Sequence, residues 1–298
     1  MHVHLADYRI YPEYWLDGIK NSIVGSMREN DNTDIPDIIL KNIIQNSLKD
    51  FDGSKLIAQM DEAGIDKSVV LLADLGFNKE DNKLDIEELY RVHYEVFSRF
   101  KDRLIIFGGI DPARGKKGLE VFEKGIKEYG FKGLKLYPPC GFDLNDRSLH
   151  PIYEMCEHYD LPVLAHIGPS LPSMRSSFDY PSSILEAAKN FKKIPFILGH
   201  AAIMYFTESY MLPLQRENIY LEISGFQQNI KDESDMSQKL KKLFEVCPEN
   251  ILFGTDWPLF NNKGSQKVWV KYFKELDYLT EKQKELLLYE NALGILKI

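Results

Sequence analysis

The sequence has few cysteines, no long apolar run and no basic block, and each absence narrows what the protein can be. The three cysteines, Cys140, Cys156 and Cys247, are odd in number and contain no C-x-x-C spacing, so we expect a reducing compartment. No apolar run approaches the ~20 residues that a membrane-spanning helix needs, and no signal peptide precedes the first predicted strand. We therefore expect a cytoplasmic protein that does not enter a membrane.

The charge balance excludes a second class of partners. The 298-residue chain has a formal net charge of −8 and no block of Lys and Arg, which argues against nucleic acid or an anionic membrane surface. A small-molecule substrate is the expected ligand, and it can be anionic because local charge in a pocket can oppose the charge of the whole chain. No linker or low-complexity tract divides the sequence, so we expect one domain over residues 1–298, with a homodimer left open.

Helical patterns and short apolar runs alternate from Ser54 onward. Runs such as Ser68–Leu72 are continuously apolar, which is typical of strands that are covered on both faces. Together with the first five residues they predict eight strands alternating with helices, a (β/α)₈ TIM barrel whose active site lies at the C-terminal ends of the strands. The segment from Ala6 to Gly53 is predicted to be a long loop over that end, with a helical part from Asp37 to Leu48.

The predicted elements have these bounds. The strands are 2–5, 68–72, 104–110, 133–137, 162–167, 195–200, 219–224 and 251–256. The helices are 54–63, 85–100, 116–129, 149–159, 182–191, 204–215, 235–246, 266–276 and 281–296.

Histidines and one aspartate stand where predicted strands end. His2 and His4 are one residue apart, so in an extended strand they project from the same side. His166, His200 and Asp256 end later strands. By strand alternation we expect all of them to point inward, with Leu198 on the same inward face as His200 and Leu164 on the same face as His166.

Several imidazoles and one carboxylate at one barrel mouth suit a catalytic zinc or a similar divalent ion. Such an ion lowers the pKa of bound water to roughly 7 and polarises a substrate carbonyl. The other histidines, His93, His150 and His158, fall in or near predicted helices, where we expect packing or surface roles.

Motifs along the whole chain resemble those of the metal-dependent amidohydrolase superfamily. The resemblance is to its amidohydrolase-related branch, which includes aminocarboxymuconate-semialdehyde decarboxylase-like enzymes. The motifs are, in order, HVHL, MDEAGIDKSVV, GGIDP, GLKLYPP, LPVLAHIG, LGHAA, YLEISG, FGTDWP and YENALGIL. The resemblance implies one divalent metal, with zinc preferred, and proton transfer by Asp256 and His200. The metal ligands that it implies are His2, His4, His166 and Asp256.

Three further residues are candidate substrate contacts. Lys135 is expected to point inward, where it either contacts the substrate or forms an ion pair with Glu222; carboxylation to bridge two ions is the less favoured alternative. Tyr137 lies at the same predicted strand end. Arg175 belongs to a set of loop arginines that could bind a carboxylate in bidentate fashion. The other members of that set are Arg9, Arg28 and Arg147.

The resemblance does not specify the reaction, because this branch contains hydrolases, decarboxylases and hydratases. We expect hydrolysis of a small amide, lactone or ester that bears a carboxylate, through attack of a metal-activated water. The first alternative is nonoxidative decarboxylation of a small unsaturated or aromatic acid on the same metal. The second is a metal-free binding protein on the same barrel, since only Met1 precedes His2 where the family has several residues.

Overall fold

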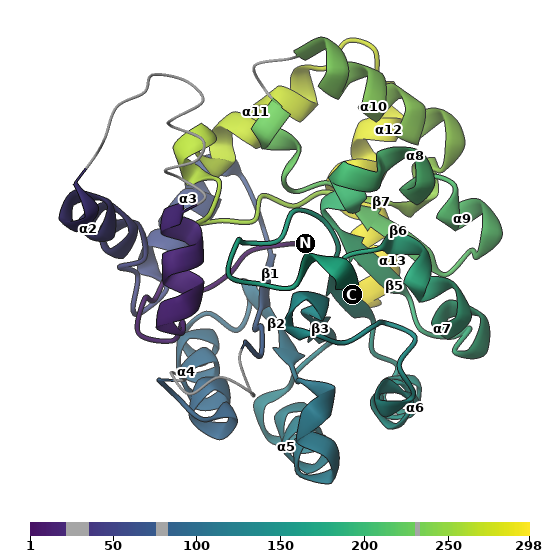
Figure 1. Cartoon of the computed structure of the whole chain (residues 1–298). Helices are drawn as coiled ribbons and strands as arrows, with labels where there is room; N and C mark the ends of the chain where they lie inside the picture. Colours follow the sequence, from purple (N-terminus) through teal and green to yellow (C-terminus); the bar gives the residue numbers. More distant parts are fainter. Residues whose placement is uncertain (22–35, 76–82, 230–232) are drawn as a thin grey trace.

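The computed structural model describes residues 1–21, 36–75, 83–229 and 233–298. Within these ranges the strands form one curled parallel sheet in the order β1 to β7, with helices packed around its outside (Figure 1). The strands are β1 (Ser68–Leu71), β2 (Leu104–Gly109), β3 (Leu134–Leu136), β4 (Val163–His166), β5 (Phe196–Gly199), β6 (Ile219–Glu222) and β7 (Ile251–Leu252).

The helices follow the predicted alternation, with one exception. The helix predicted over 54–63 is present in full and stops at Gly64, whose φ of 66° suits glycine. The helical stretch predicted around 204–215 is present but divided. It consists of a 3₁₀ segment, His200–Tyr205, and two four-residue helices, the second of which contains Pro213. The helices are α2 (Asp37–Ser47), α3 (Ser54–Ala63), α4 (Ile86–Arg99), α5 (Gly115–Tyr129), α6 (His150–His158), α7 (Ile184–Asn190), α8 (Phe206–Ser209), α9 (Leu212–Gln215), α10 (Glu233–Val246), α11 (Gln266–Glu275), α12 (Glu281–Glu285) and α13 (Asn291–Leu296).

The predicted first strand is not a regular strand, so the described sheet has seven strands rather than eight. Its residues lie between β1 and the segment after β7, where Val3 forms single bridges to Val70 and Trp257. The ladder toward Trp257 stays short because Asp256 has a φ of 51°, which interrupts the extended backbone. Helices α3 and α11 pack against each other.

The segment from Ala6 to Gly53 contains the helical part that the sequence predicts over Asp37 to Leu48, observed as α2, and a further helix before it. Residues 13–21 and α2 are helices, and residues 22–35 lie outside the described residues. Gly18 in the first of these helices lies against the loop after β4, since a Cβ there would be 2.4 Å from the Ser173 Oγ. No helix in the described ranges is long and apolar enough to span a membrane.

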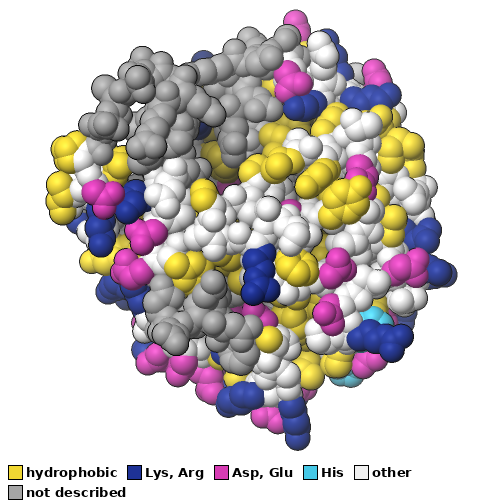
Figure 2. Space-filling view, viewed as in Figure 1, with side chains coloured by type: hydrophobic (Ala, Val, Ile, Leu, Met, Phe, Trp, Pro, Cys, Tyr) yellow, Lys and Arg dark blue, Asp and Glu magenta, His cyan; other side chains and the backbone are white. Residues whose placement is uncertain are grey.

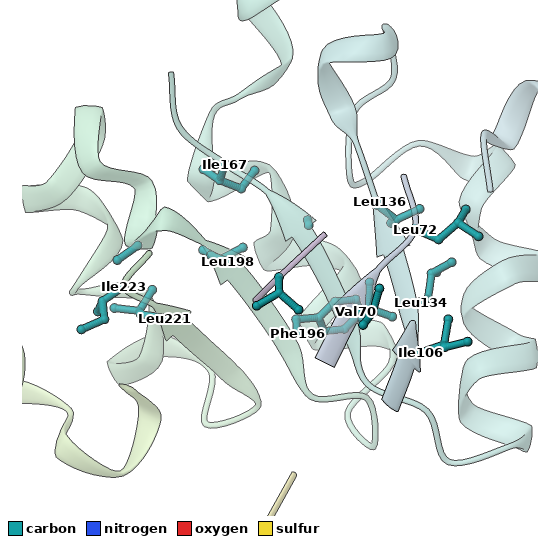
Figure 3. Packing of buried hydrophobic residues seen from close by; sticks show 14 of the residues in the cluster. Val70, Leu72, Ile106, Leu134, Leu136, Ile167, Phe196, Leu198, Leu221 and Ile223 are labelled. Carbon is teal, nitrogen blue, oxygen red and sulfur yellow. The ribbon is translucent and has the colours of Figure 1, made fainter. Parts of the chain in front are cut away.

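Alternate residues of the strands form two separate hydrophobic clusters. Leu72, Ile106 and Leu134 belong to the larger one, between the sheet and the helices (Figure 3). Members of the smaller one include Leu164 and Ile197, which cluster with Ile295 of α13 on the inner side of the curled sheet. The strands therefore have an outer face and an inner face.

This division corrects one orientation predicted from the sequence. Leu198 belongs to the outer cluster, so strand alternation alone would turn His200 outward as well. The neighbour Gly199 faces inward, because a Cβ there would lie 3.5 Å from the His2 ring. His200 reaches the interior because its φ is 64°, a left-handed conformation that turns the chain back at the strand end.

His93 makes the stability of the fold depend on pH. Its ring is 3% exposed and its Nδ1 contacts the Leu89 carbonyl at 2.9 Å. Burial lowers the pKa of His93 from 6.5 to about 4, so between these values the unfolded chain binds more protons and stability falls as the pH falls. We expect the loss attributable to His93 between pH 6.5 and pH 4 to be about 3 kcal/mol.

The test compares denaturant unfolding of the wild type and of His93→Leu over this range. Between pH 6.5 and pH 4 the free energy of unfolding of the variant should fall by about 3 kcal/mol less than that of the wild type. Above pH 7 the two should change with pH in parallel. Equal slopes below pH 6.5 would contradict the assignment.

Candidate metal centre

Three donor atoms meet where the N-terminal segment adjoins the end of β7. The Nε2 atoms of His2 and His4 are 3.2 Å apart, and they lie 3.4 Å and 3.2 Å from the Oδ1 of Asp256. Two ligands bound tetrahedrally at ~2.0–2.1 Å lie ~3.3 Å apart, so these separations match the edges of a zinc coordination shell. The structure therefore brings together three of the four ligands that the sequence predicts.

Both histidines of this set have their second nitrogen bound by the protein. The Nδ1 of His2 is 2.6 Å from the Oε2 of Glu222, and the Nδ1 of His4 is 2.8 Å from the Leu71 carbonyl. Because both partners are acceptors, Nδ1 carries the proton in each neutral ring, and each Nε2 presents a lone pair to the centre. This is the arrangement that orients metal-binding histidines in proteins.

His166 and His200 stand beside this set. The Nε2 of His200 is 3.1 Å from the Nδ1 of His166, and their ring centroids are 4.8 Å apart. The Nδ1 of His200 donates to the Ser224 carbonyl at 3.0 Å. His166 Nε2 is buried and has no hydrogen-bond partner within the part of the chain that the structure describes.

The protonation states of these groups suit a bound cation. Burial lowers the pKa of His2 and of His166 well below 6.5, so both rings are neutral near pH 7. Burial alone would raise the pKa of Asp256, but His2 and His4 outweigh it and hold that pKa below its usual value. Two bare nitrogens and one carboxylate oxygen then face one another in a buried space, which is unfavourable unless a cation lies between them. The donor set therefore fits a divalent metal.

The centre is covered. His2, His166 and His200 are 1%, 9% and 4% exposed, and the face drawn in Figure 2 shows histidine only near its lower right edge.

Lys135 is also buried, with 1% of its surface exposed, and its Nζ has no hydrogen-bond partner among the described residues. Burial lowers the pKa of Lys135 to about 8, against the opposing effects of Asp256 and Glu222. Of the two favoured alternatives for Lys135, the ion pair with Glu222 is not formed among the described residues, because Glu222 Oε2 contacts His2 and its Oε1 accepts from the Ser224 amide at 2.6 Å.

The other candidate substrate residues occupy different places. Tyr137 is half-buried, with its ring centroid 4.7 Å from that of His166. Arg175 is exposed and lies along Gly141, where an added Cβ would be 2.7 Å from its Nη1. The remaining loop arginines do not gather at the centre: Arg9 pairs with Asp7, Arg147 is exposed, and Arg28 lies outside the described residues.

Sequence reasoning missed the partner of His2. The sequence offers Glu222 only as one possible partner of Lys135, and it predicts no role for Ser224. The alternation along β6 places both on the inner face, since Leu221 and Ile223 belong to the outer cluster. That alternation was a usable signal, but the distance between β6 and the N-terminal segment was not visible in the sequence.

A curled parallel α/β sheet with imidazoles and a carboxylate gathered at the C-terminal ends of its strands is an arrangement that can hold a divalent metal. The chain belongs to the amidohydrolase family, whose sequence model, described as Amidohydrolase, matches residues 1–298. Family members bind a divalent metal. A search of curated proteins finds no match.

Solved structures share the fold at low sequence identity. A 2,6-dihydroxybenzoate decarboxylase in complex with 2,6-dihydroxybenzoate is 17% identical, with a TM-score of 0.69 over 100% of this chain and 99% of that one. The 5-carboxyvanillate decarboxylase of Novosphingobium aromaticivorans, complexed with manganese and 4-hydroxy-3-methoxy-5-nitrobenzoic acid, is 17% identical, with a TM-score of 0.67 over 95% and 92%. The 4-oxalomesaconate hydratase LigJ of Rhodopseudomonas palustris is 18% identical, with a TM-score of 0.63 over 99% and 95%.

Proposed function

We propose that this protein is an enzyme that holds one divalent ion with His2, His4, His166 and Asp256 and acts on a small carbonyl compound that bears a carboxylate. The observation that carries the proposal is the donor set, in which two Nε2 atoms and the Asp256 Oδ1 are spaced as ligands of one ion. Zinc is preferred because imidazole nitrogen and carboxylate oxygen suit it, and manganese is the alternative, as in the 5-carboxyvanillate decarboxylase.

The first candidate reaction is hydrolysis. An ion held by His2, His4, His166 and Asp256 would supply Lewis-acid chemistry: it would polarise a substrate carbonyl and lower the pKa of a nearby water to roughly 7. His200 has its Nδ1 proton bound to the Ser224 carbonyl, so its Nε2 is the atom that can take a proton from the attacking water. Asp256 is the other acceptor within the centre. The protonated group then delivers the proton to the leaving atom of the amide, lactone or ester.

The second candidate is nonoxidative decarboxylation of a small unsaturated or aromatic acid. Two of the similar solved structures are decarboxylases of hydroxylated benzoic acids. Lys135 supports this reading, because its buried Nζ has no partner among the described residues and can bind a substrate carboxylate. In this reaction His200 and Asp256 deliver a proton to the substrate carbon as carbon dioxide leaves.

We also propose that residues 2–4 complete the barrel as its eighth strand. The bridges from Val3 to both Val70 and Trp257 support this proposal, as does the contact between α3 and α11.

One assay separates the two reactions. The zinc- and manganese-loaded protein is offered a panel of lactones and N-acyl amino acids, and separately a panel of hydroxybenzoic and muconate-type acids. We expect turnover of the first panel, detected by proton release for the lactones and by the free amine for the N-acyl amino acids. Release of carbon dioxide from the second panel, with no turnover of the first, would reject hydrolysis in favour of decarboxylation.

A further inference from the structure

Glu222 and Ser224 each contact both His2 and His200. Glu222 is 0% exposed, and its Oε2 lies 2.6 Å from His2 Nδ1 and 2.7 Å from the Ser224 Oγ. Its Oε1 accepts from the Ser224 amide at 2.6 Å. The carbonyl of the same Ser224 receives the Nδ1 proton of His200. One carboxylate therefore holds one histidine directly and the other through a single residue.

The surrounding backbone leaves room for this carboxylate and for little else. A Cβ added to Gly254 would lie 2.1 Å from the Glu222 Oε1 and 2.7 Å from the His2 Cβ. The His200 amide lies 3.4 Å from the Oε2. Glu222 is thus enclosed by the strand ends that carry the centre.

Atoms of His2, His200 and Glu222 also lie close enough together to be considered as a cation site. The distance between His2 Nδ1 and Glu222 Oε2 argues against an ion there. At 2.6 Å it matches a charge-assisted hydrogen bond and is shorter than the ~3.3 Å that separates two ligands of a tetrahedral ion.

We propose that Glu222 is a positioning residue that, together with Ser224, fixes the Nδ1–H tautomers of His2 and His200. It thereby turns the Nε2 of His2, the metal ligand, and the Nε2 of His200, the proton-transfer residue, toward the centre at the same time. The consequence for the metal rests on the proposed function, whereas the consequence for the tautomers does not. Groups that orient metal-binding histidines typically contribute 10–100-fold to metal affinity.

The test measures zinc affinity of metal-free protein by competition with a chromophoric chelator. Glu222→Gln keeps the size of the side chain and should weaken zinc binding about 10–100-fold. At saturating zinc its turnover should remain about tenfold below the wild type, because Ser224, whose carbonyl binds His200, loses the carboxylate that accepts from its amide and its hydroxyl. The matched control is Asp50→Asn, since Asp50 is a buried carboxylate that accepts from the Lys55 and Leu56 amides at 3.0 Å and 2.9 Å. It should bind zinc like the wild type.

Two results would overturn the proposal. One is a Glu222→Gln variant that binds zinc within about twofold of the wild type. The other is a second zinc ion in the wild type that Glu222→Gln lacks, which would make this group a cation site.

A measurement on the wild type covers the case in which the variant does not fold or the protein binds no zinc. Long-range ¹H–¹⁵N spectra of the metal-free protein near pH 8 report which ring nitrogen carries the proton. We expect Nδ1 to be protonated in His2 and in His200. An Nε2–H tautomer of His2 would reject the positioning role, while failure to bind zinc would reject only the proposed function.

Discussion

Replacing His166 by alanine should remove both the bound metal and turnover, whereas replacing His200 by alanine should remove turnover alone. His166 has a buried Nε2 without a hydrogen-bond partner among the described residues, as expected for an atom that donates to an ion. His200 has its Nδ1 bound to Ser224 and faces His166, which suits proton transfer. Loss of a general acid–base group typically costs 10²–10⁴-fold in rate, so we expect kcat of His200→Ala to fall at least about 100-fold.

Elemental analysis of protein purified without chelators measures the first effect, and turnover of the substrate found in the panel assay measures the second. The wild type and His200→Ala should each carry close to one ion per chain. His158→Ala, at an exposed position at the end of α6, is the control and should match the wild type in both. Full metal content in His166→Ala would reject that residue as a ligand, and wild-type turnover in His200→Ala would reject its catalytic role.

The largest loss of stability is expected for Gly109→Ala at the end of β2. A Cβ at this position would lie 2.1 Å from the Leu72 carbonyl oxygen and 2.8 Å from the Asp74 amide nitrogen. Both atoms belong to the backbone, so relief requires β1 and β2 to separate. We expect the free energy of unfolding to fall by about 3 kcal/mol, at the upper end for an overpacked core.

Gly294→Ala is the matched substitution. Gly294 is exposed in α13, and an added Cβ would meet no atom within 4 Å. Alanine should stabilise this helix by about 1 kcal/mol. Urea denaturation of the two variants beside the wild type gives both values, and a Gly109→Ala midpoint equal to that of the wild type would show that the strands can move apart at little cost.

The sequence was sufficient to predict the elements wherever their signals are local. The amphipathic stretch over 54–63 ends at a glycine, and α4 begins with a capping box at Asp85, so both helices could be placed from a few neighbouring residues. The order of the strands followed from the alternation of helical patterns and short apolar runs along the sequence. Asp256 could be placed at the centre because it ends the last strand-like run.

What could not be predicted depends on backbone torsions and on distances between strands. His200 reaches the centre through a left-handed φ of 64°, and a histidine does not signal that conformation as a glycine or asparagine at the same position would. The choice of Glu222 between His2 and Lys135 is a matter of which inward side chain lies nearer. Strand alternation gives the face of a residue, and it does not give that distance.

The donor set lies at a seam, formed by residues 1–4 and 253–257, that joins distant parts of the sequence. Contacts across it include the hydrogen bond between the residue 1 amine and the Phe253 carbonyl, 252 residues apart in the sequence. Closing a flexible loop of that length costs about 5 kcal/mol in chain entropy, so contacts across the seam are expected late in folding. An ion shared by His2, His4 and Asp256 would bind only after the seam has formed. Metal uptake would then report completion of the fold, and partly unfolded chains would release their metal before the rest of the sheet opens.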